Sequence, residues 1–237
     1  AVNENGYRYE GANPNNYITM EKTDGTTELW RIIGLFPDGA NGENVIRVRK
    51  VGYESAAYDQ NDKNYWPNTT LYTSLKSIYS TAKYKNTINY KIYLGTSSAY
   101  KTLTAEGWYT AERGTTAGAS AGGLTSAVVS VGLMYPSDYG YGVLASECDR
   151  TLKLYWGGYS KTSACYDDNW LFQGSNLDQW LISPNHSETD VVVIASNVGC
   201  AGDDYVSTSY SYSPVMALKS DVMVTGSGTQ SDPYVMQ

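Results

Sequence analysis

One strand and the turn that ends it can be read from Glu28-Leu29-Trp30-Arg31-Ile32-Ile33-Gly34-Leu35-Phe36-Pro37-Asp38-Gly39. The aromatic, β-branched and other apolar residues up to Phe36 are typical of a strand, and Pro-Asp-Gly is a strong turn signal. A second run follows at residues 44–51, where Ile46 and Val48 fall on one side. We therefore predict that these two runs form a hairpin.

The second run also carries the longest basic cluster of the chain, formed by Arg47, Arg49 and Lys50. Arg47 and Arg49 alternate with the apolar residues, so they lie on the opposite side of the predicted strand. We expect that side to be a solvated strand face. The net charge of −7 over 237 residues disfavours both nucleic acid and anionic membranes as partners.

A helix is predicted directly after Pro67-Asn68, and Asn68 or Thr69 can cap its first turn. Its apolar residues recur with helical spacing and fall on one face; they are Leu71, Leu75, Ile78 and Ala82. Residues 83–92 are expected to form a second helix.

Short strands are predicted later in the chain, at residues 191–195 and 215–218. Residues 114–123 are rich in glycine and other small residues, and we expect a flexible surface loop there. Residues 221–237 read as a turn-rich tail. Many short antiparallel strands, one or two helices and long loops indicate an α+β fold. Without an internal repeat, we expect residues 1–237 to form a single domain.

Three cysteines allow one disulfide. A bridge between Cys148 and Cys165 would close a loop of about 18 residues and stabilise the fold by roughly 3 kcal/mol, which leaves Cys200 unpaired. With one histidine and no Cys-x-x-Cys spacing, a zinc site is not expected.

The sequence also bears on location. No run of 18 apolar residues occurs, so we expect no direct insertion of this chain into a membrane. The chain opens at Ala1-Val2-Asn3-Glu4 without a signal peptide, as a trimmed product would. Charged residues make up only 17%, below the usual fraction for a cytosolic protein. We expect an extracellular or cell-surface protein, anchored by a segment absent from this chain.

Tyrosine dominates the aromatic residues, with 23 copies against two of phenylalanine. A protein that needed aromatic residues only in its core would use more phenylalanine, because a buried tyrosine must also satisfy its hydroxyl. Tyr combined with Ser, Gly and Asn is typical of recognition surfaces, although tyrosine is also common on half-exposed strands. The polar, tyrosine-rich run at residues 203–212 is therefore interpreted as part of a binding surface.

Signals for catalysis are weak. Asp167-Asp168 and Asp203-Asp204 are adjacent pairs, whose side chains would point to opposite sides of a strand. His186 lies in a polar turn, and no Gly-x-Ser-x-Gly elbow accompanies it. The acidic runs offer oxygens of the kind that Ca²⁺ takes, but they lack the spacing of an EF-hand. We expect a non-catalytic protein without a cofactor, with Ca²⁺ as the one alternative.

Several motifs follow one another along nearly the whole chain. They are Gly6-Tyr7-Arg8-Tyr9-Glu10-Gly11, Asn13-Pro14-Asn15-Asn16-Tyr17, Leu29-Trp30-Arg31-Ile32-Ile33-Gly34, Trp108-Tyr109-Thr110-Ala111-Glu112-Arg113-Gly114, Gly132-Leu133-Met134-Tyr135-Pro136-Ser137-Asp138-Tyr139-Gly140-Tyr141, Asn169-Trp170-Leu171, Trp180-Leu181-Ile182-Ser183-Pro184, Pro214-Val215-Met216-Ala217-Leu218-Lys219-Ser220 and the Gly-Thr-x-Ser-x-Pro-Tyr tail. In this order they resemble an uncharacterised domain family of exported and pilin-like surface proteins of Gram-positive gut bacteria.

The resemblance implies a C-type-lectin-like fold, similar to that of the variable proteins of diversity-generating retroelements. In those proteins a ligand-binding surface near the C-terminus is diversified by mutation at adenines, and the Asn and Tyr content of residues 197–212 agrees with such a process. The family usually carries Arg just before the Pro-Val of its late strand, where this chain has Ser213. Either this end of the strand has itself been diversified, or this member of the family has drifted in sequence at that position. Related formylglycine-generating enzymes act through a cysteine pair to which Cys200 cannot be matched, so their activity is not implied.

We therefore expect a recognition domain displayed on a bacterial or phage surface, with an unknown protein or glycan on a cell surface as its ligand. The expected contact residues are Asn185, His186, Asn197, Asp203, Asp204, Tyr205, Tyr210, Tyr212 and Ser213. Two alternatives stay open. One is a structural pilus or adhesin subunit, whose surface contacts other subunits, and the other is a glycan-acting enzyme.

Overall fold

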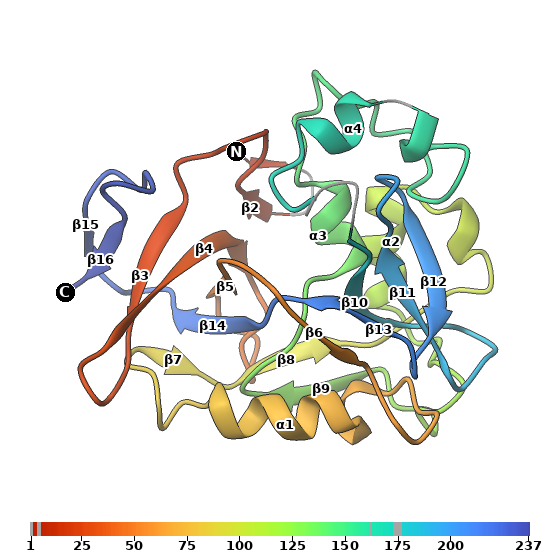
Figure 1. The fold of residues 1–237 in the computed structure, drawn as a ribbon, viewed down its shortest axis with the longest axis horizontal. Helices are drawn as coiled ribbons and strands as arrows, with labels where there is room; N and C mark the ends of the chain where they lie inside the picture. Colours follow the sequence, from red (N-terminus) through yellow and green to blue (C-terminus); the bar gives the residue numbers. More distant parts are fainter. Residues whose placement is uncertain (1, 4–5, 162, 173–176) are drawn as a thin grey trace.

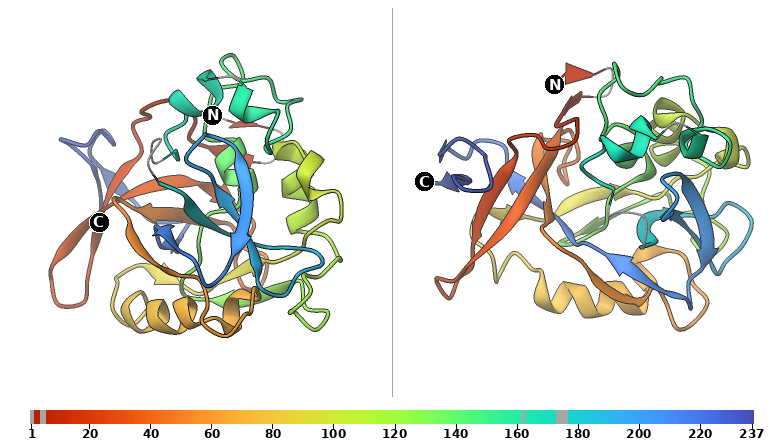
Figure 2. Two further views of the ribbon diagram at one scale, coloured as in Figure 1. Left: turned by 45° about the vertical axis from the view of Figure 1, so that its right-hand side comes forward. Right: turned by 45° about the horizontal axis from the view of Figure 1, so that its top comes forward.

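A computed structural model describes residues 2–3, 6–161, 163–172 and 177–237 of the chain (Figure 1). Within these residues the chain forms three β-sheets and four α-helices, which confirms the predicted α+β class. The three views show α1 at one end of the molecule and α4 at the opposite end (Figures 1 and 2).

The largest sheet has nine strands in the described chain. Seven of them follow in the spatial order β15 (Val224–Thr225), β16 (Tyr234–Met236), β3 (Tyr17–Glu21), β4 (Thr27–Phe36), β5 (Val45–Lys50), β14 (Val215–Lys219) and β7 (Thr87–Ile88). In addition, β2 (Gly6–Arg8) pairs with β4, and β1 (Val2–Asn3) pairs with β2. The β16–β3 pairing is parallel, so the predicted tail contributes two short strands to this sheet.

The predicted hairpin is confirmed, because β4 and β5 pair antiparallel. A bulge between Ile32 and Gly34 shifts their register. As a result β4 contributes Trp30 to one hydrophobic core and Phe36 to the other. Strand β2 approaches β4 so closely that a Cβ at Gly34 would lie 2.2 Å from the carbonyl oxygen of Tyr7.

The second sheet contains the strands that were expected to carry the binding surface. Its order is β12 (Ala201–Tyr205), β11 (Val191–Ala195), β10 (Gln179–Pro184), β13 (Ser209–Tyr212) and β6 (Glu54–Ala57), and only β10 and β13 are parallel among these pairs. Strand β11 is buried along its whole length, as its apolar run predicts. Val192 and Ile194 face one core and Val193 and Ala195 the other, so this sheet separates two cores.

The first predicted helix is confirmed at its start. After a 3₁₀ turn, η1 (Trp66–Asn68), α1 (Thr70–Ile78) begins with the Thr69 hydroxyl accepting a hydrogen bond from the N–H of Tyr72. The helix ends at Ile78, which is exposed, and Ala82 lies beyond it. The predicted apolar face is therefore shorter than expected.

The second predicted helix, at residues 83–92, is wrong. The segment forms β7 and then β8 (Tyr90–Tyr93), which pairs with β9 (Ser126–Val129). Tyr90 and Ile92 are buried in alternation with partly exposed neighbours, and this period of two indicates a strand.

Three other α-helices were not predicted, so the expectation of one or two helices is too low. These are α2 (Ala105–Glu112), α3 (Pro136–Gly140) and α4 (Ala164–Asp167), with the 3₁₀ helices η2 (Tyr100–Thr102) and η3 (Tyr159–Lys161). Helices as short as α3 and α4 show no helical period in the sequence.

The predicted disulfide is present. It joins Cys148 to Cys165 on α4, with Cα atoms 4.9 Å apart, and leaves Cys200 buried as a free thiol. Residues 114–123 form an irregular loop that is anchored by Gly118, where an added Cβ would meet Pro184 at 2.7 Å. Across the described residues, the helices are all too short or too polar to cross a membrane.

Candidate functional site

Strand β12 places the predicted acidic pair on opposite faces of its sheet. Asp203 pairs with Val193 and Asp204 with Val192, and these two valines belong to different cores. Because successive side chains of a strand alternate between faces, Tyr205 lies on the face of Asp203. The predicted contact residues of β12 therefore divide between two faces of the sheet, of which β12 is one edge.

Asp203 is the centre of a polar cluster at this edge. Its Oδ2 accepts hydrogen bonds from the Tyr100 hydroxyl at 2.9 Å and from Nδ2 of Asn185 at 3.4 Å. Its Oδ1 accepts from the Tyr155 hydroxyl at 2.8 Å and lies 3.7 Å from Nζ of Lys101. Three hydrogen bonds and one ion pair therefore converge on Asp203, which joins η2, the loop before η3 and the turn after β10 to β12.

Burial and ring contacts fix the cluster in place. Burial raises the pKa of both Tyr100 and Tyr155, and the neighbouring Asp203 carboxylate raises them further. Both phenols therefore stay protonated and continue to donate near neutral pH. The two rings meet edge-on at 5.4 Å, and the Lys101 ammonium lies 5.3 and 6.0 Å from their centroids.

Two exposed aromatic residues lie close in the chain to members of this cluster. Trp156 follows Tyr155 in the chain and is 68% exposed, whereas Tyr205 shares the face of Asp203 and is 56% exposed. Exposed rings of this size give contact area with few rotatable bonds. We use the name aromatic rim for Trp156 and Tyr205 together with Lys101, whose ammonium lies over the rings of Tyr100 and Tyr155.

The backbone of β12 is protected at its outer edge. The N–H of Ala201 donates to the carbonyl of Leu154, the N–H of Tyr205 donates to the Asp204 carboxylate, and the carbonyl of Tyr205 accepts from Thr208. An added strand would need such groups unpaired. Both ends of the outer edge of β12 are therefore already paired.

On the other face of β12, Asp204 accepts a hydrogen bond of 2.5 Å from the hydroxyl of Tyr210. The ring of Tyr210 lies 5.0 Å from that of Trp180. Burial and the Asp204 carboxylate raise the pKa of the Tyr210 hydroxyl. This pair joins β12 to β13 and is partly exposed.

The turn after β10 places Asn185 inside the protein. Its Nδ2 donates to the Tyr100 hydroxyl at 2.9 Å, and its Oδ1 accepts from the N–H groups of Ser187 and Glu188. His186 follows in the same turn and is partly exposed. Asn185 thus shapes the turn, and we correct its expected role as a contact residue.

Tyr212 and Ser213 are also buried. The Tyr212 hydroxyl donates to Glu54 at 2.8 Å. The Ser213 hydroxyl accepts from Arg49 at 3.0 Å and donates to the carbonyl of Gly52 at 2.7 Å. Because their polar atoms are satisfied internally, neither side chain is offered to a ligand, and both are removed from the expected surface.

Asn197 lies in the turn between β11 and β12 and is partly exposed. Its backbone N–H donates to Oδ1 of Asp178 at 2.9 Å. This contact fixes the turn that leads into β12, at the opposite end of the strand from Tyr205.

Sequence reasoning missed the other half of the site, which consists of Tyr100, Lys101, Tyr155 and Trp156. These residues come from η2 and from the loop before η3. A bridge between Tyr155 and Ala201 brings that loop to β12. Contacts between such distant segments leave no local pattern, and the aromatic residues in polar loops are the only available signal.

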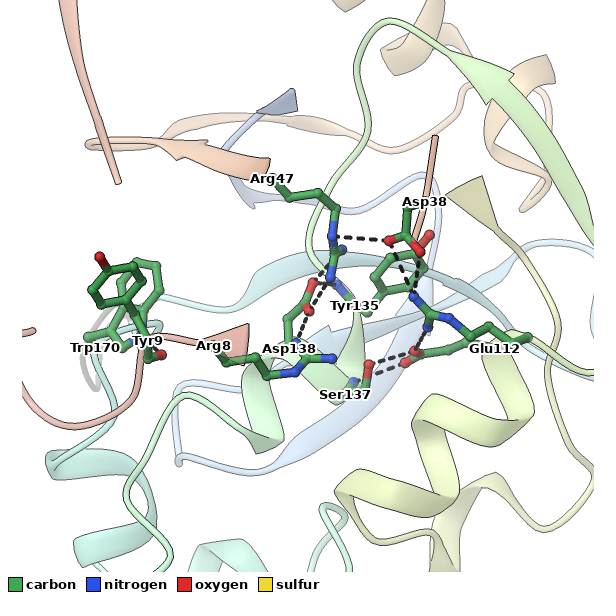
Figure 3. Close-up of polar contacts among 10 residues, drawn as sticks. Arg8, Tyr9, Asp38, Arg47, Glu112, Tyr135, Ser137, Asp138 and Trp170 are labelled. Atoms are coloured by element: carbon green, nitrogen blue, oxygen red, sulfur yellow. Dashed lines mark hydrogen bonds and ion pairs between the residues drawn. The ribbon is translucent and has the colours of Figure 1, made fainter. Parts of the chain in front are cut away.

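A second cluster of charged side chains is buried between β2, β5, α2 and α3 (Figure 3). Asp138 accepts hydrogen bonds from Arg8 and, at 2.7 and 2.9 Å, from Arg47. Asp38 lies 3.3 Å from Nε of Arg47 and 2.9 Å from Arg113. The alternating charges form a chain of ion pairs that crosses the interior.

Opposite charges set the protonation of this chain of ion pairs. Burial alone would raise the pKa of Asp138, but Arg47 and Arg8 hold it at about 2. Burial alone would lower the pKa of Arg47, but the carboxylates of Asp138 and Asp38 raise it. Asp138 and Arg47 are therefore charged throughout the physiological range.

Arg47 and Arg49 are both buried, so the prediction of a solvated strand face is wrong. The alternation along β5 was read correctly, but the side opposite Val48 is covered by protein. Asp138 compensates the charge of Arg47, and the Ser213 hydroxyl contacts Arg49.

Glu112 is the titratable group of the interior whose pKa lies nearest neutrality. Burial raises its pKa to about 7, although Arg113 and hydrogen bonds from Ser137 favour the charged form. The N–H and the hydroxyl of Ser137 donate to its two oxygens at 2.9 and 2.6 Å (Figure 3). A general acid or base titrates in this range, but the side chain is fully buried and a substrate does not reach it in this conformation.

Within the described residues, no group of three or more His, Cys, Asp or Glu side chains is arranged to hold a metal ion. Comparison with known proteins found no family model, no curated protein and no solved structure that matches the chain. The function is therefore inferred from the geometry of the site.

Proposed function

We propose that this chain is an extracellular recognition domain with a C-type-lectin-like fold, which binds a protein or glycan at the β12 edge without catalysis. The observation that carries the proposal is the position of exposed Trp156 and Tyr205 beside the fixed polar cluster of Asp203. Rigid aromatic side chains next to preorganised polar groups lose little entropy when a ligand binds.

The disulfide supports export, because such bonds persist in oxidising compartments. A display role on a bacterial or phage surface agrees with this. The exposed members of the aromatic rim also suit diversification by a retroelement, since exposed side chains tolerate substitution better than buried ones.

The placement of the charged groups supports a non-catalytic role. Glu112 and Asp138 are buried and bonded to Ser137, Arg8 and Arg47. The Asp203 carboxylate accepts three hydrogen bonds and forms an ion pair with Lys101. In each case the carboxylate holds neighbouring elements together.

The test uses the intact chain and a Trp156→Ala/Tyr205→Ala/Lys101→Ala variant, both labelled and applied to a glycan array and to a panel of intact Gram-positive bacteria. We expect the wild type to bind a subset of these probes and the variant to lose at least tenfold in affinity. Tyr53→Ala is the matched control, because Tyr53 is also exposed but precedes β6 at the opposite edge of the sheet. Equal binding by the triple variant would contradict the proposal.

A structural pilus or adhesin subunit is the second candidate, and one observation favours it. A groove of about 420 Å³ is lined by Tyr7, Leu35 and Ile46 among others, and Tyr7 is largely exposed. Apolar surface of this kind suits contacts between subunits. Sedimentation of the wild type and of Tyr7→Ser over a wide concentration range tests this candidate, which requires self-association that the substitution weakens.

A further inference from the structure

A second, more polar groove of about 650 Å³ lies beside α2. This volume falls in the range of roughly 300–1,000 Å³ that ligand sites occupy. Its lining carries six hydroxyl side chains, from Thr96, Ser97, Thr104, Thr110, Thr115 and Thr116. No residue of the aromatic rim lines this groove. The two regions are linked through η2, which lies between the lining residues Ser97 and Leu103 and carries Tyr100 of the Asp203 cluster.

The groove has little charge. Glu106 is the one ionisable residue of its lining, and it is exposed in the first turn of α2. The N-terminus of that helix is already capped, because the Thr104 hydroxyl accepts from the N–H of Gly107 at 3.1 Å. A carboxylate beside a capped helix end does not attract an anion. The groove therefore does not suit an anion.

The remaining lining favours a hydroxylated ligand over a peptide. It consists of small residues and Leu103, so it has no deep apolar pocket for an anchoring side chain. A hydroxyl both donates and accepts hydrogen bonds. A row of Ser and Thr hydroxyls is therefore complementary to a molecule whose own groups are mainly hydroxyls.

Thr96 is the buried member of this row. Its side chain is 2% exposed, and its Oγ1 has no hydrogen-bond partner among the described residues. Its N–H donates to the carbonyl of Thr116 at 2.9 Å, which fixes the residue in the groove lining. A buried hydroxyl without a partner is unfavourable. Because this oxygen is closed to solvent, neither a ligand nor a bridging water reaches it in this conformation.

We propose that this groove is a binding site for a neutral oligosaccharide. The accessible hydroxyl side chains of the lining contact the sugar hydroxyls, and Glu106 accepts one of them at the open end. The site is separate from the β12 edge, so it goes beyond the function proposed above.

The test titrates the intact chain with cellohexaose, xylohexaose, mannohexaose and N,N′-acetylated chitohexaose by calorimetry. Thr110→Trp fills the groove from the exposed side of α2, and Ser74→Trp on the exposed side of α1 is its matched control. We expect at least one hexasaccharide to bind the wild type and Ser74→Trp equally, and Thr110→Trp to lose at least tenfold.

Thr96→Val removes the unpartnered hydroxyl and keeps the shape of the side chain. We expect it to leave sugar binding unchanged, because the hydroxyl is closed to the groove, and not to lower the melting temperature. Trp156→Ala should leave this binding unchanged. Absence of binding by all four sugars overturns the proposal, as does binding that survives Thr110→Trp. Sugar binding that is lost in Trp156→Ala but kept in Thr110→Trp assigns the ligand to the β12 edge, which overturns this inference and supports the function proposed above.

Discussion

Arg47 on β5 and Asp138 on α3 form a bidentate ion pair in the interior, with hydrogen bonds of 2.7 and 2.9 Å, although 91 residues separate them. Arg8 shares the same carboxylate, so one aspartate bridges two buried guanidinium groups from two strands, and Asp38 supplies Arg47 with a second carboxylate. The largest sheet is thereby fastened to α3, which packs against the sheet that carries β12.

Asp138→Asn should therefore be strongly destabilising. The substitution leaves Arg8 and Arg47 buried without their shared counter-charge, and breaking a buried ion pair in this way costs about 3–5 kcal/mol. Urea unfolding followed by tryptophan fluorescence measures the loss. Glu147→Gln, at an exposed acid, serves as the control and should change the free energy of unfolding by less than about 0.5 kcal/mol. A small loss for Asp138→Asn would show that the ion pair contributes little.

Glu112 should make the protein less stable as the pH rises from about 4.5 to 7. Its pKa is about 7 in the folded protein against an ordinary value of 4.5, so the folded state binds more protons over this interval. The free energy of unfolding then falls by about 3 kcal/mol between these limits and stays level above them.

Glu112→Gln removes this titration while preserving the size of the side chain. We expect the free energy of unfolding of the variant to change much less than that of the wild type between pH 5 and 8. Glu106→Gln, on the exposed side of the same helix, should keep the wild-type profile. A wild-type profile that is flat over this range would contradict the raised pKa.

Removing the disulfide should lower stability without changing the fold. The loop between Cys148 and Cys165 has a sequence separation of 17, and its closure contributes roughly 3 kcal/mol. A Cys148→Ser/Cys165→Ser variant should therefore melt roughly 6–12 °C lower than the wild type. Dithiothreitol should lower the melting temperature of the wild type by a similar amount and leave the variant unaffected, since Cys200 is already a thiol.

Tyr205 and Tyr212 should respond differently to truncation. Tyr205→Ala removes an exposed ring and should change the free energy of unfolding by less than about 0.5 kcal/mol. Tyr212→Ala removes a buried ring and should cost about 3–5 kcal/mol. Tyr212→Phe, which loses only the hydrogen bond to Glu54, should cost about 1 kcal/mol. Equal losses for the two alanine variants would refute the assigned burial.

Local signals predicted the parts of the fold that depend on neighbours in the chain. The β4–β5 hairpin, the start of α1 at Thr69 and the buried strand β11 each follow from short patterns. Residues 83–92 were misassigned because their partners are distant: β7 pairs with β14 and β8 pairs with β9. Whether such a segment forms a strand depends on the strands with which it pairs, and its own residues do not determine those partners.

The same dependence on residues distant in the chain explains the errors in the predicted site. Arg47 looked like a solvated residue because Asp138, which compensates its charge, lies on another element. Asp203 was found from the polar run that contains it, but Tyr155 and Lys101 were not, since they reach it from other loops. The burial of Tyr212 and Ser213 depends on β6 and β5 and could not be read from their own polar surroundings.

The four donors gathered on Asp203 also bear on how this protein can evolve. Three of them come from buried side chains, whereas Trp156 and Tyr205 have most of their area in solvent. Substitution of Trp156 or Tyr205 leaves the hydrogen bonds on Asp203 in place, so the fold tolerates sequence change at these two positions.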